Sequence, residues 1–157
     1  HFFLFTYDKA LETLTLEYYS SDLEKVWKRE FAETTSAVYD YTKNNIYLVA
    51  NNELYIINIE TGEDTFQPCF IGEKLDIRKL SDGILTVGEN KSDAVIKNDL
   101  QGNMIWKTNL AGNVYRVEGI QLVGDTILLQ LQLEDGLHYV VLDNATGSVI
   151  ADAVSVS

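Results

Sequence analysis

One short turn recurs three times in the chain: Asn58-Ile59-Glu60-Thr61-Gly62, Asn98-Asp99-Leu100-Gln101-Gly102 and Asp143-Asn144-Ala145-Thr146-Gly147. Each copy places Asp or Asn four residues before a glycine, and the glycines lie 40 and 45 residues apart. An Asp or Asn side chain can accept hydrogen bonds from the N–H groups of a turn, and glycine adopts the positive φ that a tight reversal needs. The three copies therefore predict three equivalent β-hairpins.

Short runs of alternating apolar and polar residues surround each of these turns. Such alternation is typical of strands with one buried face. Three units share one order of four strands, and the recurrent turn joins the third strand to the fourth. The expected strands are 37–41, 46–50, 54–59 and 64–70 in the first of these units, 75–80, 84–88, 94–98 and 104–110 in the next, and 114–122, 126–133, 137–142 and 148–154 in the last.

An incomplete unit precedes these three, with expected strands at 2–7, 13–19 and 25–31 and no opening strand. The last of these stretches also fits a helix. Ser21 and Glu24 match the capping box that begins a helix. One face of that helix would carry four apolar residues, Leu23, Val26, Trp27 and Phe31. We favour the strand, because Val26-Trp27-Lys28 echoes Ile105-Trp106-Lys107 at the same position of a later unit.

The repeat predicts an all-β fold of antiparallel four-stranded blades, about three and a half blades of a β-propeller. We expect residues 1–157 to form a single repeat domain with units at approximately 1–31, 37–70, 75–110 and 114–154. Such an array leaves sheet edges and apolar blade faces uncovered, which a soluble protein usually hides. We therefore expect the chain either to be a fragment of a longer chain or to self-associate with a second copy through its open blade edges.

Aromatic residues follow two of the recurrent turns at a fixed distance. Phe66 comes four residues after Gly62, and Trp106 comes four residues after Gly102. Both positions fall on the expected fourth strand of a unit. Large aromatic side chains contribute much of the contact area where two sheets meet. We therefore expect Phe66 and Trp106 to pack between neighbouring blades.

The array resembles PQQ-like β-propeller repeats, whose blades often end in a D-x-x-T-G-K-x-x-W type of stretch. The best match is Leu54-Tyr55-Ile56-Ile57-Asn58-Ile59-Glu60-Thr61-Gly62-Glu63. Four positions depart from that pattern: Asn58 and Asn98 replace Asp, Ala151 replaces an aromatic residue, and Leu23 replaces Gly. In the quinone-dependent dehydrogenases that this resemblance implies, the cofactor lies on the axis of a full propeller, with calcium and, in some members, adjacent cysteines. This chain has neither that number of blades nor a cysteine pair, so we expect no cofactor in it.

Composition narrows the classes of partner. Twelve Lys plus Arg against 24 Asp plus Glu give a formal net charge of −12, which repels phosphate backbones and anionic lipid surfaces. We therefore expect no nucleic acid as a partner. The apolar start at residues 1–5 is too short to span a bilayer, so we expect no membrane insertion.

The single cysteine, Cys69, excludes an intramolecular disulfide, and its apolar neighbours predict a small buried side chain rather than a nucleophile.

Polar loops offer the candidate binding face. In propellers that resemble this array, ligands often contact the loops that join second and third strands. The candidate residues in and beside these loops are Asn52, Glu53, Glu89, Asn90, Asp93, Asp135 and His138. Their carboxylates and amides would suit a cation or a basic partner, but polar side chains also occur at any solvated hairpin end. We expect His138, the only internal histidine, at such a solvated end rather than in a metal site or in the role of a base.

The sequence contains none of the common hydrolase, metalloprotease, P-loop or EF-hand motifs. We therefore expect no catalytic residues and no metal ligands. The first hypothesis is a non-catalytic interaction or ligand-binding module, a propeller scaffold within a larger extracytoplasmic or cell-surface protein, whose partner is a protein or a small ligand. The alternative is a part of a quinone-dependent, PQQ-like propeller enzyme whose cofactor ligands lie outside this chain.

Overall fold

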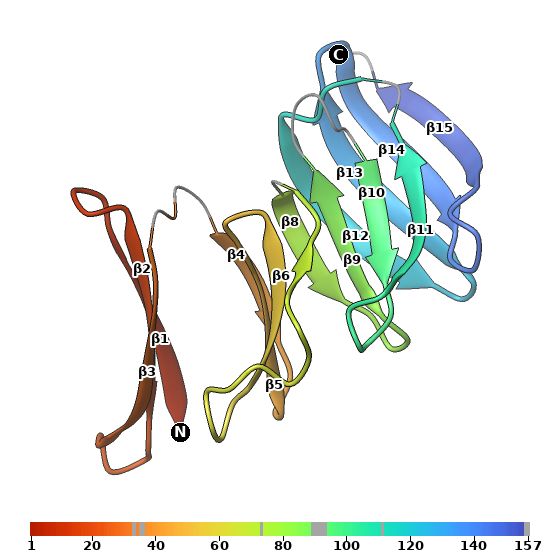
Figure 1. Ribbon diagram of the computed structural model, residues 1–157. Helices are drawn as coiled ribbons and strands as arrows, with labels where there is room; N and C mark the ends of the chain where they lie inside the picture. Colours follow the sequence, from red (N-terminus) through yellow and green to blue (C-terminus); the bar gives the residue numbers. More distant parts are fainter. Residues whose placement is uncertain (33, 35–36, 73, 89–93, 111, 156–157) are drawn as a thin grey trace. The chain divides into compact units, whose positions relative to one another are not determined.

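The computed structural model describes residues 1–157 except 33, 35–36, 73, 89–93, 111 and 156–157. The described residues form strands and turns, so none of them forms a helix long and apolar enough to cross a membrane. The chain divides into two compact units, residues 1–71 and residues 72–157. Each unit contains two antiparallel sheets (Figure 1).

The first unit pairs a three-stranded sheet with a four-stranded one. The three-stranded sheet has the order β1-β2-β3, with bounds Phe2–Asp8, Thr13–Tyr19 and Lys25–Phe31. The four-stranded sheet has the order β4-β5-β6-β7, with bounds Ala37–Tyr41, Asn45–Ala50, Glu53–Asn58 and Cys69–Phe70. The missing opening strand of the first blade is therefore confirmed.

The second unit contains two four-stranded sheets. One has the order β11-β10-β9-β8, with β8 at Lys74–Lys79, β9 at Ile84–Gly88, β10 at Ala94–Asn98 and β11 at Met104–Asn109. The other has the order β12-β13-β14-β15, with bounds Arg116–Val123, Thr126–Leu133, Gly136–Asp143 and Val149–Ser155. The all-β prediction of antiparallel blades is confirmed, and apart from β7 each strand begins and ends within two residues of its expected bounds.

Alternating burial along the strands creates one core in each unit. Along β2 and β13, every second side chain is buried, as a strand with one covered face requires. The core of the first unit gathers Leu14, Leu16, Tyr18, Phe31, Ile46, Leu48, Ala50, Ile57 and Ile59. The core of the second unit gathers Leu80, Leu85, Val87, Val95, Trp106, Val114, Ile120, Ile127, Leu129, Leu131, Leu133, Val140 and Leu142. Apolar side chains removed from water in this way supply most of the stability of each sheet pair.

Two of the three recurrent turns form the hairpin that their sequence predicts. Asn58 Oδ1 accepts hydrogen bonds from two N–H groups of its turn, at 2.9 and 3.2 Å, and Asp143 Oδ1 accepts one at 2.9 Å. Gly62 and Gly147 have φ values of +74° and +76°. Each of these glycines donates its N–H to the carbonyl of the Asn or Asp four residues earlier, at 2.8 Å.

The turn that ends at Gly102 differs from this prediction by one residue. Asp99 Oδ1, and not the side chain of Asn98, accepts two turn N–H groups, both at 2.9 Å. The pairing of β10 with β11 shifts register between Lys97 and Asn98, which moves the reversal along by one position. Asn98 is buried instead, and its side-chain nitrogen donates to the Gly102 carbonyl at 2.8 Å. The prediction of Asn98 as the capping residue is therefore wrong.

The strand expected at residues 25–31 is confirmed as β3, and the competing helix is wrong. Residues 20–24 form a turn instead of a helical cap, in which Ser20 N–H donates to the Glu24 carbonyl at 2.9 Å. Leu23 lies in this turn with φ of +65°, at the position where the other units have glycine. Leu23 thus adopts a left-handed conformation that a Cβ atom disfavours.

Replacement of Leu23 by glycine is expected to raise the free energy of unfolding by about 0.5–1 kcal/mol, because the left-handed backbone conformation then carries no Cβ penalty. Little contact is lost, since the Leu23 side chain is 71% exposed. Leu11 is a matched control, because it is 72% exposed in a turn and has no positive φ. Urea denaturation should show a gain for L23G and none for L11G. Equal effects of the two substitutions would contradict the strained turn.

The fourth strand of the second sheet is shorter than expected. The sequence predicts a strand over 64–70, but only Cys69–Phe70 pair with β6, and a single bridge joins Ile57 to Asp64. Pro68 interrupts the ladder, because proline has no N–H to donate and restricts the residue before it.

Two expectations for side chains of this segment are wrong. Phe66 lies in a bend outside the ladder and is 39% exposed, so it is not a packed residue between blades. The Cys69 side chain is half-buried rather than buried. Both differences follow from the interrupted strand, because alternation along a ladder no longer sets which side chains face the core.

Trp27 packs on the recurrent hairpin of the next blade in the first unit. Its indole N–H donates to the Ile59 carbonyl at 2.7 Å. A Cβ added to Gly62 would lie 2.5 Å from a ring carbon of Trp27, so only glycine allows this approach. Two residues later on β3, Arg29 donates to the Gly62 carbonyl at 3.3 Å and pairs with Asp64 at 2.6 Å.

Trp106 repeats this arrangement in the second unit. Its indole N–H donates to the Asn144 carbonyl at 2.9 Å, and a Cβ added to Gly147 would lie 2.4 Å from its ring. Thr108, two residues later on β11, donates to the Gly147 carbonyl at 2.5 Å. The predicted packing of Trp106 between blades is confirmed. In both units the tryptophan contacts the residue three positions before the hairpin glycine, which explains why the tryptophan recurs at this position of the repeat.

Candidate functional site

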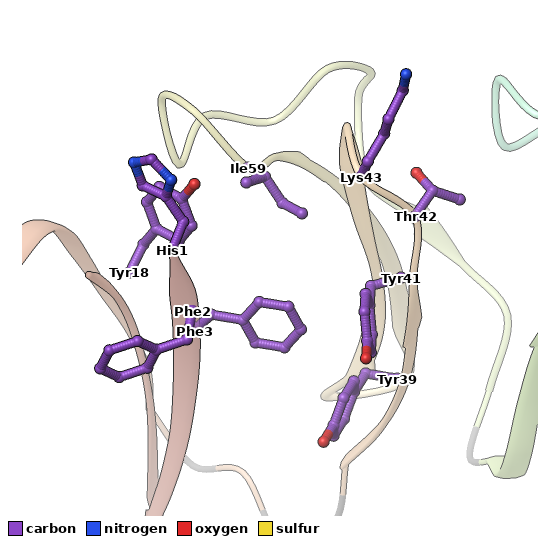
Figure 2. Close-up of a pocket in the computed structure, with 9 residues that line it drawn as sticks. All are labelled: His1, Phe2, Phe3, Tyr18, Tyr39, Tyr41, Thr42, Lys43 and Ile59. Carbon is purple, nitrogen blue, oxygen red and sulfur yellow. The ribbon is translucent and has the colours of Figure 1, made fainter. Parts of the chain in front are cut away.

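The first unit contains an aromatic pocket of about 430 Å³ between β1 and β4 (Figure 2). Its volume lies within the range of ~300–1,000 Å³ that is typical of small-ligand sites. Figure 2 shows Tyr39 and Tyr41 projecting from β4 toward β1. Its lining includes the aromatic residues Phe3, Tyr18, Tyr39 and Tyr41, together with Phe2, whose ring stacks on Tyr19.

Strand register places these rings together. Phe3 on β1 pairs with Tyr18 on β2, and directly paired residues of antiparallel strands share a face. The Phe3 ring stands edge-on to Tyr41, with 4.9 Å between ring centres and an interplanar angle of 83°. The next residue on the same face, Phe5, stacks on Tyr39 at 4.2 Å. Alternate residues of two strands therefore build the wall of the pocket.

The aromatic pocket is open on one side. Tyr39 is 46% exposed and Tyr41 is 57% exposed. Tyr18 forms the buried base of the pocket, and burial, with a smaller effect of Glu60, raises the pKa of its hydroxyl. Tyr18 therefore stays a neutral hydrogen-bond donor at physiological pH. Lys43 adds a positive charge at the rim, and no carboxylate belongs to the described lining of the pocket.

The predicted loop residues fall in two different units. Asn52 and Glu53 lie at the β5–β6 turn of the first unit, where Asn51 and Asn52 have φ values of +53° and +66°. Asp135 lies in the β13–β14 turn of the second unit, and His138 lies on β14. Glu89, Asn90 and Asp93 lie outside the described residues. The structure brings Asp135 and His138 together in the second unit, and it places Asn52 and Glu53 side by side in the first.

One side-chain amide and one backbone carbonyl of the β5–β6 turn bond to the chain itself. Asn51 Nδ2 donates to the Ala32 carbonyl at 2.7 Å, and the Asn52 carbonyl accepts the Ile71 N–H at 2.8 Å. Asparagine also tolerates the left-handed conformation that this two-residue turn requires. These contacts explain the asparagine pair by the geometry of the turn, without a ligand.

His138 is buried, so the prediction of a solvated histidine is wrong. Its side chain is 6% exposed, with Nε2 at 2.6 Å from Asp135 Oδ1 and Nδ1 at 2.8 Å from Asp152 Oδ1. An imidazole donates at both nitrogens only in its charged form. Burial lowers the pKa of His138, but the hydrogen bonds to Asp135 and Asp152 outweigh burial and raise the pKa above its ordinary value of 6.5. Asp135 is close to His138 in the sequence. Asp152 is close to His138 only in the folded chain, because β15 pairs with β14.

The raised pKa of His138 predicts a loss of stability toward alkaline pH. The unfolded chain releases this proton near pH 6.5 and the folded chain at a higher pH, so the stabilisation is complete below pH 6.5 and disappears as the pH rises through the folded pKa. Urea midpoints measured from pH 6 upward should fall in the unmodified chain and fall less in D152N. The control is D125N, because Asp125 is exposed and makes no side-chain contact with His138. Identical slopes in all three proteins would contradict the charged imidazole.

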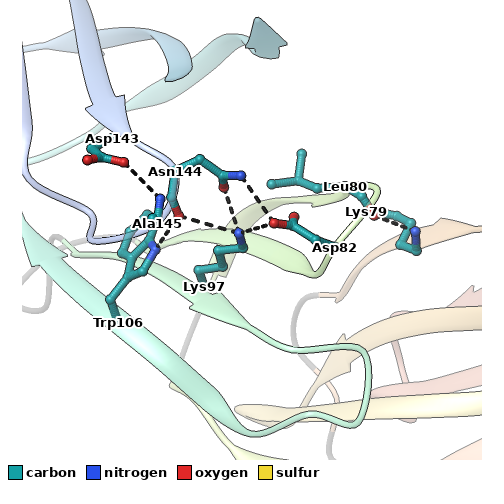
Figure 3. A network of polar contacts seen from close by, with 8 residues as sticks. All are labelled: Lys79, Leu80, Asp82, Lys97, Trp106, Asp143, Asn144 and Ala145. Carbon is teal, nitrogen blue, oxygen red and sulfur yellow. Dashed lines mark hydrogen bonds and ion pairs between the residues drawn. The ribbon is translucent and has the colours of Figure 1, made fainter. Parts of the chain in front are cut away.

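A second polar network surrounds Lys97 on β10 (Figure 3). Lys97 is 3% exposed, and its Nζ lies 2.9 Å from Asp82 Oδ2 and 2.6 Å from Asn144 Oδ1. The hydrogen bond from Lys97 holds the pKa of Asp82 below its ordinary value. Because Asn144 also accepts the Trp106 indole N–H, the network ties the β8–β9 turn to the Gly147 hairpin. Lys97 therefore serves the packing of two blades.

Among the described residues, no three His, Cys, Asp or Glu side chains form a group that could hold a metal ion. The two buried polar clusters, around His138 and Lys97, contain acids and bases that bond to one another. The aromatic pocket differs, because its rings are exposed. Sequence reasoning missed this pocket, although the alternation of Tyr39 with Tyr41 and of Phe3 with Phe5 is the signal that could have indicated it.

No family model and no curated protein matches the sequence of this chain. Solved structures match along almost all of it. BamB from Moraxella catarrhalis is 15% identical with a TM-score of 0.68, over 96% of this chain and 48% of BamB. The dihydro-heme d1 dehydrogenase NirN, in complex with DHE, is 11% identical with a TM-score of 0.68, over 98% of this chain and 37% of NirN.

A further match is BBS1N in complex with ARL6DN, which is 12% identical with a TM-score of 0.61, over 98% of this chain and 54% of BBS1N. At these identities the likeness concerns the fold alone. The chain spans about half or less of the length of these three proteins. The neighbours are β-propeller proteins, so the chain has the β-propeller fold. It corresponds to about half of a complete propeller.

Proposed function

We propose that this chain is a non-catalytic binding module, a part of the propeller scaffold of a larger protein, and that its partner docks in the aromatic pocket. The observation that carries this proposal is the exposure of Tyr39 and Tyr41 around a hollow of about 430 Å³. Exposed aromatic rings that surround a concave site are enriched where proteins and ligands bind. In the polar clusters of the second unit, by contrast, the charged groups pair with each other.

The chemistry of the aromatic pocket indicates the class of partner. Its walls are apolar and aromatic, and its polar groups are the tyrosine hydroxyls, the His1 imidazole, Thr42 and Lys43. A group with an apolar or aromatic surface and a polar or anionic end fits this lining. Such groups occur on protein side chains and on small ligands alike. The net charge of −12 makes a nucleic acid the least suitable partner.

The probe 8-anilinonaphthalene-1-sulfonate, an aromatic anion, tests the pocket directly. We expect saturable binding with fluorescence enhancement, weakened about tenfold in Y41S, because truncation of a central aromatic residue typically costs more than 1 kcal/mol. The matched control is Y115S, since Tyr115 is 58% exposed and Tyr41 is 57% exposed. Both substitutions should leave the stability unchanged. Equal affinity of Y41S and Y115S would contradict the pocket as the binding site.

The loop residues Asn52 and Glu53 of the first unit are a second proposed location for the partner. The carboxylate of Glu53 supports it only weakly, because this residue is half-buried. Charge reversal in E53K should weaken binding of a basic partner if this face is used. A partner whose binding responds to Y41S and is unaffected by E53K uses the aromatic pocket.

Membership of the PQQ-like family, and with it the alternative of an enzyme part, stays a prediction. The Asx-capped hairpins support it, as does the shared fold of NirN, which is a dehydrogenase by name. Titration of the intact protein with pyrroloquinoline quinone and calcium, followed by absorbance, distinguishes the two hypotheses. Saturable binding of the quinone would favour the enzyme.

A further inference from the structure

The second unit contains a pocket of about 430 Å³ where β8 and β12 meet, here named the β8–β12 pocket. Strand register decides which side chains enter it. Arg78 pairs with the core residue Leu85, so Arg78 and Leu80 share the face of β8 that is turned toward the core. On β12, Ile120 and Leu122 likewise face the core. The pocket therefore lies between the core-facing sides of two strands.

The buried part of the lining is apolar. Leu80 is 5% exposed and Ile120 is 3% exposed, and both belong to the core of the second unit. Leu122 is partly buried and packs against the same core. These side chains can bury the hydrocarbon body of a small ligand, in a volume that is typical of small-ligand sites.

The polar part of the lining carries positive charge. Its side chains are Arg78, Lys79, Ser81 and Gln121, and no carboxylate belongs to the described lining. The whole chain differs, because its acidic residues outnumber its basic ones by 24 to 12. The Lys79 ammonium donates to the Leu80 carbonyl, whereas Arg78 is exposed. Arg78 is therefore the cation that a ligand can reach.

Arg78 differs from the other two arginines of the chain. Arg29 pairs with Asp64 at 2.6 Å, and Arg116 pairs with Glu118 at 2.5 Å. Among the described residues, no carboxylate lies within ion-pair distance of Arg78. A guanidinium presents parallel N–H donors that match both oxygens of a carboxylate. Such a group beside a buried apolar surface suits an anion with a hydrocarbon body.

We propose that the β8–β12 pocket binds a small organic carboxylate, whose oxygens accept hydrogen bonds from Arg78 and whose hydrocarbon body contacts Leu80 and Ile120. Ser81 and Gln121 add neutral polar groups at the same site. The lining belongs entirely to the second unit, whereas the aromatic pocket belongs to the first. This site is therefore additional to the proposed partner site, and its test is separate.

Hexanoate serves as the probe, and hexanamide and acetate are its matched controls. Titration of the intact, isotope-labelled chain, followed by heteronuclear NMR, should shift the Arg78 side-chain signal and the backbone signals of residues 78–81 and 120–123 saturably. Hexanamide keeps the hydrocarbon body without the charge, and acetate keeps the charge without the body. Each control should bind at least about tenfold more weakly than hexanoate.

The variant R78Q should weaken hexanoate binding about tenfold or more, because it removes the charged donors of the site. The matched control is R116Q, which removes the same charge from a residue outside the lining. R116Q should bind hexanoate as the unmodified chain does, and so should Y41S. Urea midpoints of R78Q and R116Q, both at exposed arginines, should stay close to that of the unmodified chain.

The outcomes separate this inference from the proposed function. Equal affinity of R78Q and R116Q for hexanoate overturns the inference, as does equal binding of hexanoate and hexanamide. Hexanoate binding that is lost in Y41S and kept in R78Q places the probe in the aromatic pocket and also overturns it. Absence of hexanoate binding, with Tyr41-dependent binding of the anilinonaphthalene probe, overturns this inference and leaves the proposed function in place.

Discussion

Substitution of Gly147 by alanine is expected to lower the free energy of unfolding of the second unit by about 3 kcal/mol or more. Gly147 has φ of +76°, which costs a residue with a Cβ atom roughly 1–2 kcal/mol. A Cβ at this position would also lie 2.4 Å from the Trp106 ring, and such overpacking typically costs a further ~1–3 kcal/mol. The two effects add, because one concerns the backbone and the other the contact between blades.

Gly124 offers a matched control for this prediction. Its φ is +62°, but a Cβ added there would meet nothing within 4 Å. G124A should therefore lose only the backbone part, about 1–2 kcal/mol. Urea denaturation followed by tryptophan fluorescence measures both variants. Equal losses in G147A and G124A would show that Trp106 does not pack on the hairpin glycine.

Truncation of Trp106 to alanine is expected to destabilise the second unit by about 3–5 kcal/mol, as buried large-to-small substitutions of tryptophan typically do. Trp106 is 7% exposed within the core, and its indole N–H is bonded to the Asn144 carbonyl. The conservative variant W106F keeps part of the apolar contact and should lose less. Differential scanning calorimetry measures the loss of stability in each variant. The control is Y115A, at an exposed tyrosine, whose free energy of unfolding should stay within about 0.5 kcal/mol of that of the unmodified chain.

The combination of both substitutions tests whether they report one contact. In a W106A background, G147A no longer places a methyl group against the indole ring, so its cost should fall to that of the backbone conformation alone. Contacting residues typically show interaction energies of about 0.5–3 kcal/mol in such cycles. Strict additivity of the two substitutions would contradict the docking of Trp106 on the Gly147 hairpin.

Much of the fold could be predicted from the sequence, because local chemistry and the repeat agree. The capped hairpins at Gly62 and Gly147 follow from an Asx side chain and a glycine at fixed spacing. The repeat also decides the ambiguous stretch Lys25–Phe31, where helical periodicity alone points the wrong way. Agreement between distant copies of one motif outweighs a local pattern, because each blade must present a matching face to its neighbour.

The wrong predictions for Asn98, Phe66 and His138 share a physical cause. Each depends on strand register or on a contact with a distant residue, which cannot be read from one short segment of sequence. The shift at Asn98 comes from a bulge in the pairing of β10 with β11. The exposure of Phe66 follows from Pro68, which interrupts a ladder. The burial of His138 requires Asp152 from the next strand.

The candidate site was harder to predict than the fold. Polar loops are the usual candidates for a binding site in a sequence, but the Asn51 side-chain amide and the Asn52 backbone carbonyl bond to their own chain. The aromatic pocket needs two strands of different sheets, and neither strand is unusual alone. Only the exposure of Tyr39 and Tyr41, beside an edge that lacks a strand, distinguishes these rings from core residues.

Within each unit, the first blade docks on the second through a tryptophan that packs on the hairpin glycine of the second blade. Nuclear Overhauser effects between indole ring protons and glycine Hα protons test it most directly in the intact chain. We expect such effects from Trp27 to Gly62 and from Trp106 to Gly147, because ring carbons lie within contact distance of both glycines. Absence of both effects, with helical carbon shifts over residues 25–31, would contradict the blade arrangement.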